Sequence, residues 1–450
     1  MRMFIFEYHT LSMLYSILQR VVRLGLRLYY SEIKVIHREQ LEHKGPKIII
    51  ANHPNTLIDA WLIGTQLDEP AHFIAKGTFF NSDFKKRFLR SLNMIPINRS
   101  GEGRTEGVSN TDTFEECYRL LDEGKTVVIF PEGTSTMELK LRELKSGTAR
   151  IALEAERRVH GKLNLKVIPV GLLYTQGEKF RSKILIQAGN GMKVDSFLPE
   201  FEENPSLAAK KLTQKFRSML EKVLVTTQDG EQEQLIMRLV KSLKSKYRDK
   251  SSDVVDEVDF TKNIRDRIEL MQLVAPWKIN AIQKQLVEVE WKLGQMSIQG
   301  DFLDRRFRSR MFLRQLLFSF IGVMLSLPVF IYGFIHNAIP YYLTDFAVPR
   351  ITKDKEYFAP LGILLGLVLY PLMYSVWLYL AYAYFEFNWW QLIFYFLTLP
   401  TSGMIAHAVA RYVTHVNQKT KYMYTVFNDK NAVVELKQKR EDLYDMVFEN

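Results

Sequence analysis

The distribution of apolar and charged residues divides this chain of 450 residues into two unlike parts. Charged residues recur throughout residues 1–310, whereas residues 315–344, 357–385 and 387–410 contain no Asp, Glu, Lys or Arg. Each of these three windows is longer than the roughly 20 apolar residues that cross a bilayer. The pattern therefore predicts an integral membrane protein, although the mean hydropathy of −0.11 alone resembles that of a soluble chain.

Basic residues beside the apolar windows predict how the chain crosses the membrane. Arg and Lys precede the first window, separate it from the second and follow the third, but only Glu386 lies between the second and third. Because Lys and Arg concentrate on the cytoplasmic side, we expect the second and third segments to form a hairpin with both ends cytoplasmic. The first, which contains Pro328, is expected to be re-entrant or kinked; three full crossings remain an alternative. The expected segments are about 315–340, 359–385 and 388–410 within a membrane domain at 313–412, followed by a cytoplasmic C-terminal tail at 413–450.

Residues 1–34 predict an amphipathic helix at the membrane interface. Between Leu11 and Leu28, apolar residues share one side of a helix and arginines another. Such a helix can direct its arginines toward anionic headgroups, and packing on its own domain is the alternative. The apolar residues are Leu14, Leu18, Val21 and Val22, and the arginines are Arg20, Arg23 and Arg27.

Residues 35–200 predict an α/β domain with a largely buried sheet and flanking helices. Short runs rich in Ile and Val alternate with helical patterns at 111–123 and 138–160, which is typical of buried strands connected by helices. The strand-like runs are "KIIIAN", "AHFIAK", "NMIPIN", "TVVIFPEG", "LKVIPVGLLY" and "KILIQAGN".

Residues 201–312 predict a charged helical region. Apolar residues at 279–296 recur every three or four positions after Pro276 and predict a helix. We expect that helix to pack against the α/β domain or the membrane hairpin. The polar run at 242–259 predicts a solvated connector.

Composition narrows the function classes. Cys117 is the sole cysteine, so the chain has neither an intramolecular disulfide nor a multi-cysteine zinc site. The net charge of +11 could suit nucleic acid, but no basic-aromatic platform or finger spacing accompanies it. Attraction to anionic lipids accounts for the charge more simply, so we expect membrane lipids and no nucleic acid as partners.

His53 and Asp59 form the first candidate for chemistry, in "IIIANHPNTLID". The two would not share a face of one continuous helix. Pro54 disfavours a helical conformation at His53 and suits a first helical position itself, so we expect His53 in a turn and Asp59 one turn into the helix. Asn52 adds turn chemistry. A carboxylate on one ring nitrogen would make His53 a general base, whereas a capping histidine with a surface aspartate is the alternative.

Other polar residues follow neighbouring strands. Because the ligand crevice of an open α/β sheet lies at the carboxyl ends of its strands, we expect these residues to meet there. The turn "FPEGT" can present backbone N–H groups to an anion, and Arg99 is a natural phosphate ligand. The expected acceptor- or phosphate-binding residues are Arg99, Glu132, Gly133, Thr134 and Lys145, and the supporting residues are Asn52, Pro54, Lys76, Pro131 and Pro169.

The motifs "NHPNTLID", "NMIPINR", "FPEGT" and "VIPVGL" occur in the order of the four signature blocks of the glycerolipid acyltransferases, which this chain resembles over roughly residues 35–200. The resemblance implies transfer of an acyl group from acyl-CoA or acyl-carrier protein to a glycerolipid hydroxyl, with His53 as the base and Asp59 as its orienting partner. It also implies that Arg99 and the Glu132–Thr134 turn bind the acceptor phosphate, that Pro169 serves acyl-donor or structural placement, and that neither a metal nor a cofactor is needed.

Three departures from the family pattern bear on the acceptor. Five residues instead of four separate His53 from Asp59, a variant similar to fungal-type glycerol-3-phosphate acyltransferases and to bacterial relatives with extra membrane segments. Asn93 replaces a usual Gly, and Ser135 replaces an Arg that commonly follows "FPEGT". The resemblance implies phospholipid biosynthesis at a bacterial inner membrane with a cytoplasmic catalytic domain. A non-phosphate lyso-lipid acceptor and a non-catalytic membrane scaffold remain alternatives.

Overall fold

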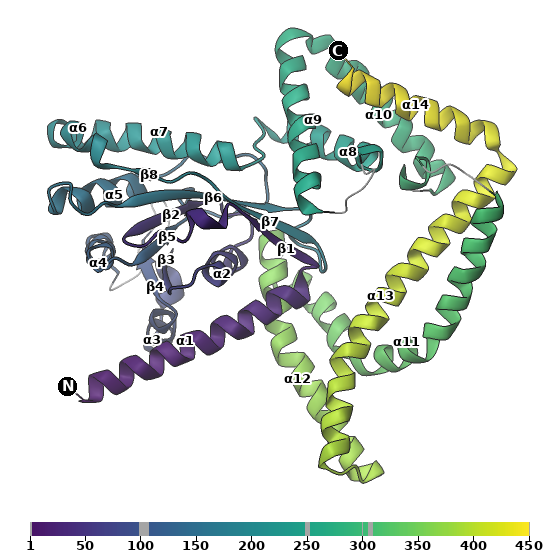
Figure 1. Ribbon diagram of the computed structural model, residues 1–450, viewed down its shortest axis with the longest axis horizontal. Helices are drawn as coiled ribbons and strands as arrows, with labels where there is room; N and C mark the ends of the chain where they lie inside the picture. The colour runs from purple at the N-terminus through teal and green to yellow at the C-terminus, as the bar shows by residue number, and fades with distance from the viewer. Residues whose placement is uncertain (1, 99–107, 248–252, 299, 305–308, 450) are drawn as a thin grey trace. The chain divides into compact units, whose positions relative to one another are not determined.

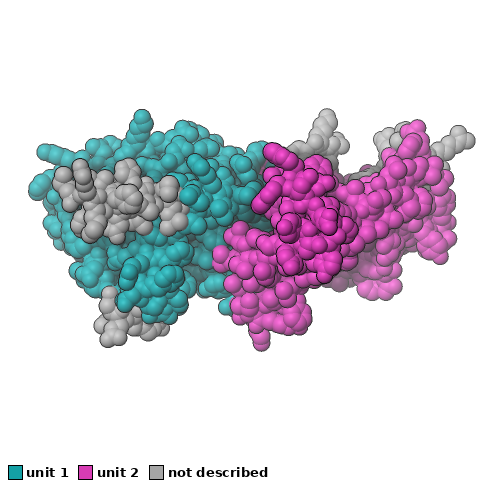
Figure 2. Space-filling model, turned by 90° about the horizontal axis from the view of Figure 1, so that it is seen from below, with its two compact units in different colours: residues 1–230, 354–360 teal, residues 231–353, 361–450 magenta. Residues whose placement is uncertain are grey.

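The computed structural model describes residues 2–98, 108–247, 253–298, 300–304 and 309–449. It divides into two units, shown in different colours in Figure 2. The first contains Met1–Gly230 together with Asp354–Pro360, and the second contains Glu231–Lys353 together with Leu361–Asn450.

A buried sheet forms the centre of the first unit (Figure 1), in the strand order β1-β7-β6-β2-β5-β3-β4, with β8 beside β6. Strands β2 to β6 run parallel, whereas β7 and β8 pair antiparallel with β6. All six predicted strands are confirmed, and β1 and β8 were not predicted. The strands are β1 (Glu32–Ile36), β2 (Lys47–Ala51), β3 (Ala71–Lys76), β4 (Met94–Ile97), β5 (Thr126–Ile129), β6 (Lys166–Tyr174), β7 (Lys183–Ala188) and β8 (Met192–Lys193).

Helices cover both faces of this sheet, and the strand order dictates which face each helix covers. Crossovers between parallel strands are right-handed. Those from β2 to β3 and from β3 to β4 run one way across the sheet, whereas those from β4 to β5 and from β5 to β6 run the other way. Consequently α2 (Leu57–Gln66) and α3 (Asp83–Ser91) lie on one face with α1 (Arg2–Tyr29), and α4 (Asn110–Asp122) and α5 (Gly147–Arg158) lie on the other with α6 (Leu198–Glu203) and α7 (Pro205–Val223).

Two local predictions in this unit are wrong. Residues 138–146 are not helical, because the chain passes through turns before α5 begins at Gly147. Pro54 is not a first helical residue either: α2 begins at Leu57, after Thr56 with φ 42°. Cys117 is fully buried in α4, and burial raises the pKa of its thiol to about 12.

Four helices of the second unit share one apolar core. They are α8 (Gly230–Tyr247), α9 (Val254–Val274), α10 (Pro276–Met296) and α14 (Lys430–Phe448). The helix predicted after Pro276 is therefore present, and its apolar seam packs in a core with α8, α9 and α14, to which Tyr422 of α13 also contributes. Residues 242–247 and 254–259, expected in a solvated connector, belong to α8 and α9.

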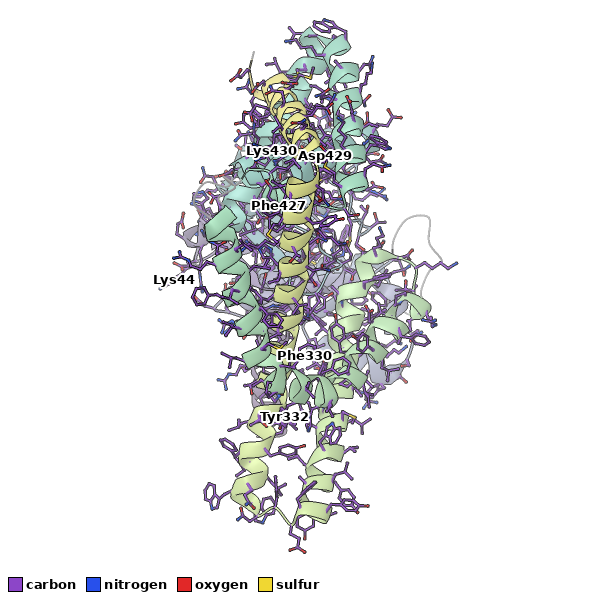
Figure 3. All side chains as sticks on the ribbon, turned by 90° about the vertical axis from the view of Figure 1, so that its right-hand side faces the viewer. Lys44, Phe330, Tyr332, Phe427, Asp429 and Lys430 are labelled. Atoms are coloured by element: carbon purple, nitrogen blue, oxygen red, sulfur yellow. The ribbon has the colours of Figure 1, made fainter. Side chains whose placement is uncertain are left out.

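The remaining long helices are α11 (Ser309–Ile351), α12 (Phe358–Phe385) and α13 (Trp389–Asn428), and each is long and apolar enough to cross a membrane. Figure 3 shows α11 changing direction near Phe330 and Tyr332, just after Pro328, which interrupts helical hydrogen bonding. Asp429, labelled in the same figure, separates α13 from α14 and caps α14 by accepting a hydrogen bond from the backbone N–H of Ala432 (2.9 Å). The expected tail therefore continues α13 and then contributes α14 to the bundle core.

Candidate active site

His53 lies at the carboxyl edge of the sheet, just after the central strand β2. Every residue of Lys47–Ala51 is buried, and Asn52 then replaces a backbone pairing with its side chain. Its amide donates to the carbonyl of Leu172 (3.0 Å) and accepts from the N–H of Leu172 (2.8 Å). Asn52 thus joins the ends of β2 and β6, and the chain leaves the sheet at His53.

The expected contact between His53 and Asp59 is present. Asp59 is the third residue of α2, and its Oδ2 lies 2.9 Å from Nδ1 of His53. The Asp59 side chain is fully buried, whereas that of His53 is 13% exposed. Because Asp59 occupies Nδ1, Nε2 on the other side of the imidazole is the nitrogen that can take a proton from a substrate.

Two further donors hold the Asp59 carboxylate. The backbone N–H of Asn55 donates to Oδ2 (2.7 Å), and the hydroxyl of Tyr174 donates to Oδ1 (2.5 Å). Burial raises the pKa of Tyr174 well above its ordinary value, and the negative charge of Asp59 adds to this. Tyr174 therefore remains a donor at neutral pH.

The ring and backbone of His53 are fixed by the turn that follows β5. Phe130 stacks on the imidazole with ring centroids 4.0 Å apart and planes 12° apart. The backbone N–H of His53 donates to Oε1 of Glu132 (3.2 Å), and its carbonyl accepts from the N–H of Thr136 (3.0 Å). The turns "NHPN" and "FPEGT" are consequently one hydrogen-bonded assembly.

Glu132 connects the two sides of this assembly through its carboxylate. While Oε1 accepts from His53, Oε2 accepts from the backbone N–H of Arg142 (3.1 Å). Burial raises the pKa of Glu132 above its ordinary value, and the two backbone hydrogen bonds oppose that rise. In this geometry Glu132 orients the backbone of His53, and its proposed contact with an acceptor stays a prediction.

The other residues predicted for acceptor binding lie around the same turn. Gly133 adopts φ 74°, a conformation that favours glycine, and Lys145 Cγ lies 3.6 Å from the position a Cβ of Gly133 would occupy. The side chains of Thr134 and Lys145 are exposed, and the backbone N–H of Lys145 donates to the carbonyl of Pro131 (2.7 Å). Arg99 lies outside the described residues.

Two supporting residues occupy places in the sheet. Pro169 is buried within β6 opposite Ile50 and accepts a hydrogen bond from the N–H of Gly189 (2.8 Å), a structural position. Lys76 ends β3 at the same edge of the sheet as the end of β2.

Tyr174, Asn55 and Tyr30 were not predicted as site residues. The side-chain amide of Asn55 donates to the hydroxyl of Tyr30 (3.2 Å) and to the carbonyl of Gly177 (3.1 Å). A signal for Tyr174 existed in the sequence, because it ends the run "VIPVGLLY" and parallel strands end at one edge. Nothing in the sequence placed Tyr30 there, since it lies between α1 and β1.

This chain is similar in sequence to known acyltransferases. Residues 32–173 match the family described as Acyltransferase. Glycerol-3-phosphate O-acyltransferase 1 of Saccharomyces cerevisiae is 25% identical over 308 residues, which cover 64% of this chain and 40% of that protein. Glycerol-3-phosphate O-acyltransferase 2 of the same yeast is 33% identical over 116 residues, 26% of this chain and 16% of that protein.

A bacterial relative is also similar. The 1-acyl-sn-glycerol-3-phosphate acyltransferase of Bacillus subtilis is 29% identical over 121 residues, 27% of this chain and 56% of that protein. The chain thus spans less than half the length of the two yeast relatives it matches.

Proposed function

We propose, on the premise that residues 32–173 are a domain of the glycerolipid acyltransferase family, that this chain is a membrane-bound glycerolipid O-acyltransferase. It moves a fatty acyl group from acyl-CoA or acyl-carrier protein to a hydroxyl of glycerol 3-phosphate or 1-acylglycerol 3-phosphate. The observation that carries the proposal is the buried Asp59 carboxylate, 2.9 Å from Nδ1 of the partly exposed His53.

The reaction follows from the orientation of this pair. Nε2 of His53 accepts the proton of the acceptor hydroxyl as its oxygen bonds to the thioester carbonyl carbon. The carbon–sulfur bond then breaks, and the departing thiolate takes the proton from His53. Asp59 stabilises the imidazolium between these steps. The N–H of Gly133 already donates to the carbonyl of Phe130 (3.1 Å), so the N–H of Thr134, next in the turn, stabilises the developing oxyanion. The reaction as proposed needs neither a metal nor another cofactor.

Cations beside the turn support a phosphate-bearing acceptor. Lys145 lies next to Gly133, and Arg99 follows β4 in the sequence. A lyso-lipid without phosphate is the second candidate acceptor, because Ser135 removes one cation that the family commonly places after "FPEGT". We assign the first unit, which contains His53 and Asp59, to the cytoplasmic face of a bacterial inner membrane. Both acyl donors are available on that face, and the basic flanks of apolar helices concentrate there.

The test is an acyl-transfer assay of the full chain in nanodiscs. Acyl-CoA and acyl-carrier protein are each paired with glycerol 3-phosphate, 1-acylglycerol 3-phosphate and a lyso-aminolipid. His53→Ala should lower turnover by at least about 100-fold, since a general base is lost. The matched control is His37→Ala, at a histidine whose side chain is 61% exposed. Full activity of His53→Ala would contradict the proposed base, and absence of transfer to every acceptor by the wild type would contradict the proposed function.

A further inference from the structure

Helix α3 exposes an aromatic pair that the fold of its own unit leaves uncovered. None of its nine residues, Asp83–Ser91, is buried. Phe84 is 77% exposed and Phe88 is 45% exposed, and their rings stack with centroids 6.3 Å apart. Large exposed apolar side chains gathered on one side of a helix indicate an interaction surface.

Basic residues border this pair. Lys85 and Arg87 are exposed, and neither forms an ion pair with another residue of the described part of the chain. On a helical projection, Lys85 lies on one side of the Phe84–Phe88 stripe and Arg87 on the other. An aromatic stripe flanked by cations is the composition of a helix that lies in the headgroup layer of an anionic bilayer.

A second helix on the same face of the sheet has the same character. Figure 1 shows α1 running along the side of the sheet that α2 and α3 cover. Helix α1 is held there by hydrogen bonds from Gln19 to the carbonyl of Gly64 and from Arg23 to the carbonyl of Thr65. Its outer side exposes Leu24 (58%) and Leu28 (43%), so both helices offer apolar side chains away from the sheet.

The first unit includes the connector between two long apolar helices. Residues 354–360, which connect two helices apolar enough to cross a membrane, belong to the first unit. Thr56, three residues after His53, donates through Oγ1 to the carbonyl of Glu356 in this connector (3.1 Å). The catalytic turn is therefore hydrogen-bonded to the segment from which α12 starts.

We propose that Phe84 and Phe88 of α3 insert into the headgroup region of an anionic bilayer, while Lys85 and Arg87 contact lipid phosphates. This surface acts together with the outer side of α1. Because α3 follows β3 at the edge of the sheet that holds His53, insertion brings that edge to the depth at which a lyso-lipid hydroxyl lies. A membrane-resident acceptor then needs to rise only slightly out of the bilayer to reach His53.

The test measures the environment of α3 in the full chain. Phe84→Cys and Phe88→Cys are each labelled with an environment-sensitive fluorophore in nanodiscs of phosphatidylcholine and phosphatidylglycerol. The buried Cys117 should not react with the fluorophore. The control for this is wild-type protein treated in the same way, which should stay unlabelled. Ser196→Cys, in the exposed η3 (Asp195–Phe197) on the α5 side, is the matched control.

The expected result is a blue-shifted emission at positions 84 and 88 that spin-labelled lipids quench and aqueous iodide does not, with the opposite behaviour at 196. Water-like emission at 84 and 88 would overturn the proposal. Protection from iodide without quenching by lipid would also overturn it, since a protein would then cover the surface. Lys85→Glu with Arg87→Glu should lower the ratio of binding to anionic over zwitterionic lipid, by about fivefold for each cation lost.

A kinetic arm rests on the proposed function, whereas the fluorescence arm does not. Phe84→Ser with Phe88→Ser should lower turnover of a long-chain lyso-lipid in the bilayer severalfold and leave that of glycerol 3-phosphate with a short-chain acyl donor unchanged. Equal losses with both acceptors would contradict the role of the surface in acceptor access. If no acceptor is acylated by the wild type, the proposed function fails and the fluorescence still decides the lipid contact.

Discussion

At the residue scale, the buried Asp59 carboxylate is the centre of the site. It faces three partners, His53, Asn55 and Tyr174, so its charge is compensated although it has no contact with solvent. A buried carboxylate without such partners would be strongly destabilising. The same hydrogen bonds fix the direction of the carboxylate, which in turn fixes the imidazole.

Tyr174→Phe tests whether this hydrogen bond positions the base. Without the hydroxyl, the Asp59 carboxylate loses the donor at Oδ1 and can turn away from the imidazole of His53. Turnover should fall about tenfold, the scale of a hydrogen bond to a charged group. The measurement is kcat at saturating acceptor. Tyr30→Phe is the matched control, because Tyr30 contacts Asn55 and not the Asp59 carboxylate; an equal loss of turnover in both variants would contradict the role of Tyr174.

Glu132→Gln tests how the carboxylate of Glu132 contributes to the free energy of unfolding. The amide of the variant accepts through one oxygen only and turns an NH₂ toward the other N–H group, whereas both oxygens of a protonated carboxyl can still accept. The variant should therefore lose about 1–3 kcal/mol of unfolding free energy relative to the wild type at acid pH. Because burial raises the pKa of Glu132 above 4.5, the folded state binds this proton more tightly than the unfolded state. The wild type therefore loses stability as pH rises from 4.5 through the raised pKa, and the difference from the variant should shrink.

Denaturation of the full chain in detergent across this pH range provides the measurement for Glu132. Glu138→Gln, at a glutamate whose side chain is 55% exposed, is the matched control and should change the unfolding free energy little. A gap between wild type and Glu132→Gln that widens as pH rises would contradict the assigned direction.

At the scale of elements, close approach of backbones joins α11 to α13. A Cβ on Gly333 would lie 2.3 Å from the carbonyl oxygen of Ser402, and one on Gly403 would lie 2.6 Å from Cγ of Asn337. Small residues let helices pack in this way where lipid provides no hydrophobic drive. Asn337 adds hydrogen bonds to Leu399 of α13 (3.1 Å) and from Tyr374 of α12 (2.6 Å), so one polar side chain links three helices.

Gly333→Ala tests this crossing. The added methyl group must displace the backbone of α13, and we expect a loss of about 1–3 kcal/mol in stability, the usual cost of overpacking. Gly322→Ala is the matched control on the same helix, because no atom lies within 4 Å of its Cβ position. Thermal unfolding in detergent should separate the two variants, and equal stability would show that the helices can separate without cost.

At the scale of the whole molecule, the turn between α12 and α13 reports the membrane topology. Glu386 is exposed and has φ 53°, and Asn388 caps α13 in a reciprocal pair with Gln391. A charged turn between two apolar helices has to reach water.

Glu386→Cys should react with a membrane-impermeant maleimide on intact cells under the predicted hairpin topology. Ser196→Cys in the catalytic unit should react only after the membrane is opened. Protection of position 386 until permeabilisation would place the turn on the cytoplasmic side and contradict the hairpin.

The sequence by itself determined the local elements and the residue types of the site. Apolar runs predicted six strands because a buried strand must be apolar on both faces, and charge-free windows predicted the long apolar helices for a similar reason. The spacing of His53 and Asp59, with Pro54 between them, predicted their contact. These features depend on neighbours close along the chain.

Only the tertiary structure decided what lies beside these elements. Pairing of β2 with β6 sets Ala51 opposite Val170, and this register brings Tyr174 within 2.5 Å of Asp59 across 115 residues of sequence. Likewise, the apolar seam after Pro276 revealed a helix but not its partners α8, α9 and α14. Many surfaces can cover an apolar seam equally well, so its partner follows from the packing of the whole chain rather than from its own pattern.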